Sequence, residues 1–148
     1  MISIIKNGLI IVAIIFLYPA IAMASLSIGY GKILWVIDGD TYQISLVGAP
    51  EGQPVRARHF DTPEQGERAQ CAAEREKAGQ ASAFARRLLP RGAVVGLSDF
   101  GRDRYGRLLA TITLADGTDL AGRMIGTGLA HAYEGGRKPG WCAPLGAP

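Results

Sequence analysis

The sequence has few of the residues that bind soft metals, and its charge is nearly balanced. Two cysteines and two histidines occur among 148 residues, and their spacing lacks the paired ligands of a zinc site. The formal net charge is +3, which is too small to indicate nucleic-acid binding by itself. No internal repeat or low-complexity segment is present, so nothing suggests a repeat architecture. Function must therefore be inferred from individual motifs.

The long hydrophobic run of this chain lies at its N-terminus. Lys6 precedes an apolar stretch over 8–20, and residues 22–24 read Ala-Met-Ala, a small-x-small cleavage pattern. We therefore expect residues 1–24 to be a signal peptide cleaved after Ala24, and the protein to be secreted or periplasmic. The competing interpretation is an uncleaved segment that tethers the protein to a membrane, because the run is only slightly shorter than a minimal transmembrane helix.

Removing that segment leaves 25–148, which is the size of one compact domain. Cys71 and Cys142 both lie in this part of the chain. In an oxidising compartment an even cysteine count most simply indicates a disulfide. It would close a loop of about 70 residues, stabilise the fold by roughly 4 kcal/mol, and pin 141–148 to the helix that carries Cys71. Two unpaired thiols are the alternative.

Hydrophobic periodicity predicts five strands and two helices. The strands are expected at 32–37, 42–47, 55–60, 94–100 and 108–114, with a loop at 49–54, a last extended piece at 129–133 and an irregular segment at 134–148. A helix over about 69–89 follows the third strand, and its charged face, including Glu74, is interpreted as solvent-exposed. A short helix at 120–125, with Asp119 as N-cap, follows the fifth strand. This order indicates a mainly β fold with helices (α+β), a five-stranded OB-type barrel.

Acidic residues occur at two strand ends that the topology should bring together. Asp38 and Gly39 are explained as a hairpin turn, but Asp40 begins the next strand, where aspartate is disfavoured. Asp61 follows the third strand, and adjacent antiparallel strands place these two ends on one edge of the sheet. Asp61 and its neighbours also fit a simple helix start, with Thr62 as N-cap. Carboxylates gathered at one edge, however, are the ligands that hard cations prefer.

The loop 101–107 between the fourth and fifth strands combines charge with an aromatic ring. It holds Arg102, Arg104 and Arg107, with Tyr105 among them. Such a loop is consistent with ordinary exposed turn chemistry. Arginine forks next to an aromatic face are also typical of a surface that binds phosphates and stacks bases.

Three motifs together resemble the thermonuclease family, the secreted staphylococcal-nuclease-like enzymes. They are Asp38-Gly39-Asp40-Thr41, then Arg56 with Asp61-Thr62-Pro63-Glu64, and then Asp103-Arg104-Tyr105-Gly106-Arg107. The resemblance extends over roughly 33–133, and three motifs in register are far more specific than any one of them.

The resemblance implies a role for each matching residue. Ca²⁺ would be held by the carboxylates of Asp40 and Asp61 and by the carbonyl of Thr62. Glu64 would be the general base that activates water. Phosphate would be bound by Arg56 and Arg107, and the nucleotide by Tyr105, Tyr133 and Arg104.

Two features depart from the family pattern. His59 stands two positions before Asp61, where alternation would put it on the same face and let it tune the metal site; the simpler interpretation is an ordinary surface histidine. The long C-terminal helix of the best-known members is missing, and we expect the Cys71–Cys142 disulfide to replace it.

The predicted function is that of a secreted, Ca²⁺-dependent phosphodiesterase. The resemblance implies cleavage of DNA and RNA with low sequence specificity that leaves 3′-phosphates. We expect single strands to be preferred and the protein to be a monomer without a stable protein partner. The main alternative is a catalytically silent OB-type module that binds single strands. Such a module would gain nothing from acidic side chains beside phosphate, because they would repel it. An exported structural or adhesion domain is a third alternative.

Overall fold

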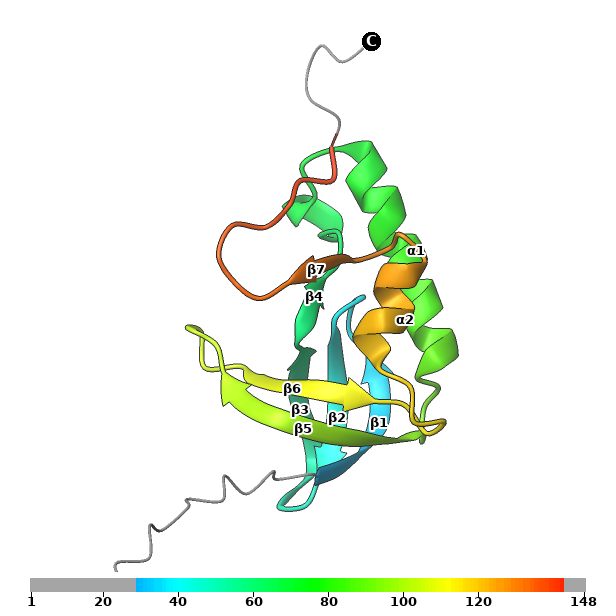
Figure 1. Cartoon of the computed structure of the whole chain (residues 1–148), viewed down its shortest axis with the longest axis vertical. Helices are drawn as coiled ribbons and strands as arrows, with labels where there is room; N and C mark the ends of the chain where they lie inside the picture. Colours follow the sequence, from blue (N-terminus) through cyan, green and yellow to red (C-terminus); the bar gives the residue numbers. More distant parts are fainter. Residues whose placement is uncertain (1–28, 143–148) are drawn as a thin grey trace, which may run out of the picture.

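The computed structural model describes residues 29–142. The predicted signal peptide at 1–24 and residues 143–148 lie outside the described residues. Within the described part, no helix is long and apolar enough to cross a membrane. Figure 1 shows a β-barrel with two helices packed along one side of the molecule.

Five strands close the barrel in the order β1-β2-β3-β6-β5. The strands are β1 (Gly29–Val36), β2 (Thr41–Leu46), β3 (Ala49–Ala57), β5 (Val94–Arg102) and β6 (Leu108–Thr113). Neighbours are antiparallel except β3 and β6, which run parallel and pair Val55 with Leu108. The predicted α+β fold with a five-stranded barrel is confirmed.

The predicted loop at 49–54 is wrong, because these residues form most of strand β3. Residue pairs such as Gln53 with Ile44 align β3 with β2, and a register shift lies between Ile44 and Leu46. The connection between the two strands is a short turn at Val47 and Gly48, and Gly48 has a φ of 84° that suits glycine. Glycine and proline content suggested a loop locally, but the partner strand β2 supplies the ladder.

The predicted third strand at 55–60 is divided in two. β3 ends at Ala57, and β4 (His59–Asp61) leaves the barrel to pair with β7 (His131–Tyr133). The break lies at Arg58, and the next residue, His59, is left-handed with a φ of 71°. Figure 1 shows the β4–β7 pair between the barrel and one end of helix α1.

Two α-helices and one short 3₁₀ turn complete the fold. The turn η1 (Gly66–Arg68) precedes α1 (Ala72–Leu88), so α1 begins later than the predicted residue 69. The second helix, α2 (Leu120–Gly126), is capped by the Asp119 side chain as predicted. A buried core fills the barrel and the space beneath both helices, and its largest members are Tyr42, Phe60, Ile33, Ile44, Leu89, Leu97, Ile112, Leu120 and Met124.

Candidate active site

Two buried aspartates lie on either side of one buried arginine. Asp40 is the residue before β2, Arg56 lies near the end of β3, and Asp61 ends β4. The Arg56 guanidinium donates to Asp40 Oδ1 at 2.5 Å and to Asp61 Oδ1 at 2.7 Å. The three residues are only 4%, 9% and 2% exposed, respectively. The sequence prediction that Asp40 and Asp61 approach one another therefore agrees with the structure.

The backbone holds this arrangement at both strand ends. The Ala57 amide donates to the Asp40 carbonyl at 2.8 Å, which fixes the start of β2 against the end of β3. The amide and the hydroxyl of Thr62 both donate to Asp40 Oδ2 at 3.0 Å. The buried Tyr42 hydroxyl donates to the Gly39 carbonyl at 2.5 Å and so supports the turn that carries Asp40. Thr62 thus ties the second acidic segment to the first.

Two further cationic side chains, Lys138 and Arg68, contact the acidic side chains on their solvent side. Lys138 donates to Glu64 Oε1 at 2.8 Å and lies 2.9 Å from Asp61 Oδ1. Arg68 lies 3.3 Å from Glu64 Oε2. Glu64 itself is partly exposed, with 31% of its side chain accessible. A partly accessible carboxylate next to a buried acid pair has the position that a general base needs to reach a water molecule.

Asp103 organises the loop between β5 and β6. Its carboxylate accepts the backbone amides of Tyr105 at 2.9 Å and Arg107 at 3.0 Å, and the Arg107 side chain at 2.7 Å. The guanidiniums of Arg104 and Arg107 lie 4.8 Å and 5.7 Å from the centre of the Tyr105 ring. Tyr105 is 69% exposed, so solvent reaches much of this side chain beside the two guanidiniums.

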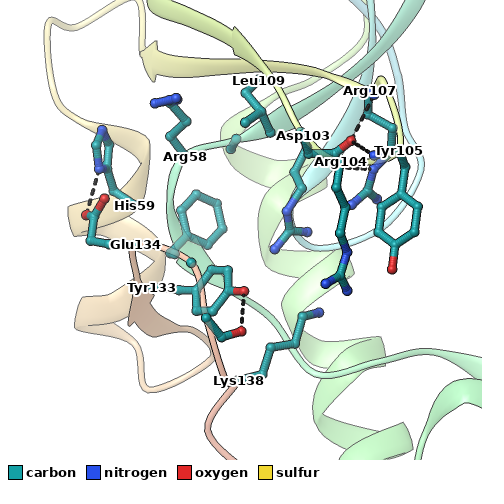
Figure 2. Close-up of a pocket in the computed structure, with 15 residues that line it drawn as sticks. Arg58, His59, Asp103, Arg104, Tyr105, Arg107, Leu109, Tyr133, Glu134 and Lys138 are labelled. Atoms are coloured by element: carbon teal, nitrogen blue, oxygen red, sulfur yellow. Dashed lines mark hydrogen bonds and ion pairs between the residues drawn. The ribbon is translucent and has the colours of Figure 1, made fainter.

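Two adjoining cavities connect these groups. A cavity of about 530 Å³ is lined by Asp40, Thr62, Glu64 and Arg68 together with Arg56, Arg104, Tyr105, Arg107 and Lys138. The last five residues also line a second cavity of about 370 Å³, whose other walls include Arg58, His59, Leu109 and Tyr133. Figure 2 shows Arg104 and Lys138 extending into the second cavity. The structure therefore brings eight of the nine predicted site residues to or next to the first cavity and places Tyr133 in the second.

His59 faces the second cavity and takes no part in the acid cluster. Its Nδ1 lies 2.7 Å from Glu134 Oε1, and its Nε2 lies 2.9 Å from Thr111 Oγ1 (Figure 2 shows the first contact). The expected alternation with Asp61 fails because the positive φ of His59 interrupts the strand. The two interpretations from the sequence were therefore both incomplete, since the side chain is neither beside Asp61 nor free of partners.

The charges in the cluster shift several pKa values. Burial, and then the Asp40 carboxylate, raise the pKa of Asp38. Burial works to lower the pKa of Arg56, but Asp40 and Asp61 raise it overall and keep the guanidinium charged. Burial likewise opposes the charge of Lys138, while hydrogen bonds to Glu64 and Asp61 raise its pKa overall. Both cations are thus held in their charged forms by the carboxylates.

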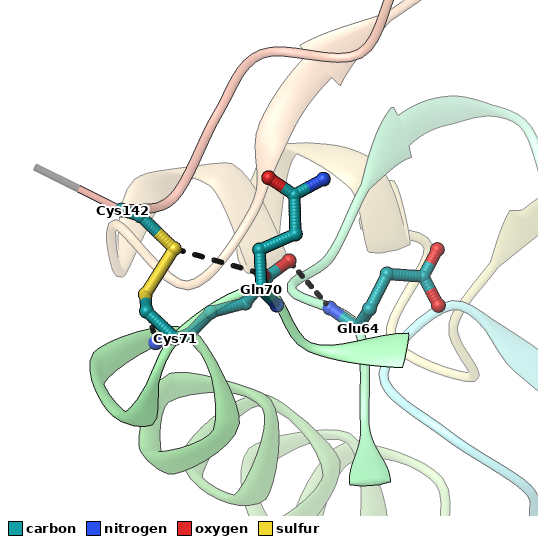
Figure 3. The surroundings of a disulfide bond; sticks show 5 residues. Glu64, Gln70, Cys71 and Cys142 are labelled. Atoms are coloured by element: carbon teal, nitrogen blue, oxygen red, sulfur yellow. Dashed lines mark hydrogen bonds between the residues drawn. A yellow bond between two sulfur atoms is a disulfide. The ribbon is translucent and has the colours of Figure 1, made fainter. Parts of the chain in front are cut away.

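A disulfide and a buried glutamate support the segment that carries Glu64. Cys71 and Cys142 are joined, as the sequence predicted. Next to this bond, Glu74 of α1 accepts the backbone amide of Glu64 at 3.1 Å and that of Gln70 at 2.7 Å. Figure 3 shows the disulfide beside the segment with Gln70 and Glu64. The prediction that Glu74 belongs to a solvated face is wrong, because it is only 5% exposed.

Sequence reasoning also missed Lys138 and the second role of Asp38. Lys138 lies in the segment that was predicted to be irregular, and no local motif marks it. The predicted disulfide, which returns the C-terminal segment to α1, was the available signal. Asp38 was explained by the hairpin alone, yet its Oδ1 accepts the Asp40 amide at 3.1 Å and it lines the first cavity.

The donor set fits a hard divalent cation. It consists of carboxylate oxygens of Asp40 and Asp61 and the backbone of Thr62, and such oxygens suit Ca²⁺ or Mg²⁺. Two cations, Arg56 and Lys138, balance these carboxylates in the structure. Among residues 29–142, a close group of three metal-binding side chains is formed by Cys71, Glu74 and Cys142, but its two sulfurs are joined in the disulfide. The acid pair at the barrel edge is therefore the candidate metal site.

A closed five-stranded barrel with two buried acids, a buried arginine and an arginine-rich loop at one edge defines a class of protein. It is a closed OB-type barrel, and its acids and arginines lie beside one cavity. The family model described as "Staphylococcal nuclease homologue" matches residues 54–140. This match covers more than half of the chain, and the protein belongs to that family. Members of the family are generally metal-dependent.

Two curated relatives agree with this assignment. Each is called "Uncharacterized endonuclease", one from Escherichia coli O157:H7 and one from Escherichia coli. Each is 30% identical over 105 residues, which cover 71% of this chain and 61% of the relative. The chain thus spans about three fifths of the length of the curated relatives it matches.

Proposed function

We propose that this protein is an exported, metal-dependent nuclease that hydrolyses phosphodiester bonds in DNA and RNA. The proposal includes Ca²⁺ as the metal, a preference for single strands, low sequence specificity, 3′-phosphate products and a monomeric state. Family membership and the endonuclease name of the relatives support the nuclease activity. The choice of Ca²⁺ and the 3′-phosphate products are supported by the resemblance of the three motifs.

The observation that carries the proposal is the position of acids beside arginines on one cavity. Asp40 and Glu64 line the same cavity as Arg56 and Arg107. Carboxylates repel a bound phosphate, so a module that only binds nucleic acid has no use for them there. The same carboxylates are required if a divalent cation is bound and water is activated.

Each residue then has a chemical role. Asp40, Asp61 and the Thr62 carbonyl would hold the metal, which, when bound, polarises the phosphoryl group. Glu64 takes a proton from the attacking water, since its carboxylate is accessible from the cavity.

The arginines and the aromatic rings hold the substrate. Arg56 and Arg107 donate to the phosphate oxygens as negative charge grows on them. Tyr105 and Arg104 provide an exposed stacking face, and Tyr133 contributes a wall of the adjoining cavity. Phosphate and stacking contacts carry no base code, which supports low sequence specificity.

The test is the digestion of single-stranded DNA, duplex DNA and RNA by the purified protein with Ca²⁺, with Mg²⁺ and with a chelator. We expect Glu64→Gln to lower turnover by about 10² to 10⁴, the range of general-base catalysis, while nucleic-acid binding is nearly unchanged. Glu67→Gln is the matched control, because Glu67 is an exposed acid three residues away and should leave turnover unchanged. Binding without cleavage under every ionic condition would contradict the proposal and favour the silent OB-type module.

A further inference from the structure

The Lys138 ammonium lies between two acidic side chains of the candidate site. Its ammonium lies 2.9 Å from Asp61 Oδ1 and 2.8 Å from Glu64 Oε1. Asp61 Oδ1 also accepts a hydrogen bond from Arg56 at 2.7 Å. The same carboxylates are proposed to hold the divalent cation and to activate water. Lys138 therefore neutralises the acid site directly.

The backbone around Lys138 is anchored on both sides, so this contact follows from the fold. On one side, β7 pairs with β4 and sets His131 opposite Asp61. On the other, Cys142 is bonded to Cys71 at the start of α1. Trp141, next to Cys142, stacks on His131 with ring centres 3.8 Å apart. The chain from 134 to 142 thus forms a strap across the acid site.

Lys138 and Arg56 both contact Asp61, but they differ in how firmly they are held. Arg56 is 9% exposed and is fixed by a second ion pair with Asp40. The Lys138 side chain is 41% exposed and ends a flexible four-carbon stem. It also lines both cavities, so the second cavity offers its ammonium another position. Of the two cations, Lys138 is the one that can leave the carboxylates.

We propose that Lys138 is a built-in counter-cation, which holds Asp61 and Glu64 in the metal-free protein and is displaced when a divalent cation binds. An ammonium and a divalent cation on the same carboxylate oxygen repel each other strongly at such short distances. Metal binding therefore includes the loss of two Lys138 ion pairs. This inference rests on the proposed function, because it requires the metal to bind at Asp61.

The test is a calorimetric titration of Ca²⁺ into the wild type and Lys138→Met. We expect Lys138→Met to bind Ca²⁺ roughly tenfold more tightly, within the range for losing the two ion pairs of a partly exposed ammonium. Arg137→Met is the matched control, because it removes the same charge from the neighbouring, exposed residue of the same segment. Its Ca²⁺ affinity should stay close to that of the wild type. Lys138→Arg, which keeps the charge, should also bind Ca²⁺ like the wild type.

Thermal unfolding provides a second readout that does not depend on activity. Without its counter-cation, Lys138→Met should melt at a lower temperature than Arg137→Met in chelator. Adding Ca²⁺ should raise the melting temperature of Lys138→Met more than that of Arg137→Met. Equal Ca²⁺ affinities and equal Ca²⁺-induced shifts in all variants would overturn the inference and leave the nuclease proposal intact. No Ca²⁺ binding by any of them, wild type included, would overturn both the calcium site and the inference.

Discussion

At the scale of single residues, Arg56 shows how one side chain serves two neighbours. It pairs with Asp40, 16 positions earlier, and with Asp61, five positions later. The second spacing could be recognised in the motif, whereas the first depends on the pairing of β2 with β3. Because all three side chains are buried, removing the guanidinium would leave two acids without their shared partner. The fold therefore provides the balance of charge between Arg56 and the two aspartates.

Asp103 gives a prediction about pH. Partial burial opposes its ionisation, but hydrogen bonds from the Arg107 side chain and from the Arg107 and Tyr105 amides lower its pKa overall from 3.8. A group whose folded-state pKa is lowered stabilises the fold above its unfolded pKa, and this contribution is lost as pH falls through the folded-state pKa. The ionised carboxylate thus orders the arginine-rich loop at neutral pH.

We expect Asp103→Asn to be less stable than the wild type at about pH 7 and the difference to shrink toward about pH 3. Thermal unfolding at a series of pH values measures this difference. Glu51→Gln, at an exposed acid of β3, is the control and should match the wild type throughout. A difference that stays constant over the whole range would show that the Asp103 charge does not hold the loop.

At the scale of elements, the first turn of α1 supports the segment that carries Glu64. Cys71 caps the helix, and Glu74 reaches back to the amides of Gln70 and Glu64. A helix that packs against the barrel with one apolar stripe thus also fixes the loop before it. Glu74 can accept these amides because the loop folds back over the start of the helix.

We expect Glu74→Ala to lower the free energy of unfolding by about 2 to 4 kcal/mol, because two amides lose their buried acceptor. Turnover should fall as well, since the backbone of Glu64 would no longer be held. Urea unfolding and single-substrate kinetics measure the two effects. Glu76→Ala, on the exposed face of the same helix, should change stability by less than about 0.5 kcal/mol. Equal effects of the two variants would contradict a positioning role for Glu74.

At the scale of the whole molecule, the disulfide joins the C-terminal end of the described fold to the start of α1. It links residues 71 positions apart and closes the loop that contains α1, β5, β6, α2 and β7. The strap from 134 to 142 is held by this covalent link together with the Glu134–His59 contact, the Lys138 ion pairs and the Trp141 stack.

We expect replacement of Cys71 and Cys142 by serine to lower the free energy of unfolding by up to about 4 kcal/mol, from loop-closure entropy. Urea unfolding of the wild type with and without reductant should reproduce the same loss. The double variant should not respond to reductant, which makes it the internal control. A wild-type midpoint that reductant leaves unchanged would show that the bond does not stabilise the fold.

Local periodicity, composition and short motifs in the sequence determined much of the fold class and of the candidate site. They predicted the barrel class, both helices, the Asp119 cap, the disulfide and the residues of the three motifs. The disulfide followed from the even cysteine count of a chain expected to be exported. The other signals lie within one element or in neighbouring elements, where side-chain spacing directly reflects the local structure.

Only the tertiary structure decided the other features, because they depend on contacts between distant segments. β3 extends over 49–54 because β2 pairs with it, and β4 turns away at His59 to join β7. Glu74 is buried because a loop folds over it. Lys138 reaches Glu64, 74 positions earlier, because a disulfide and a strand pair bring the C-terminal segment back across the site. No local pattern encodes such contacts, since chain closure and packing alone bring these residues together.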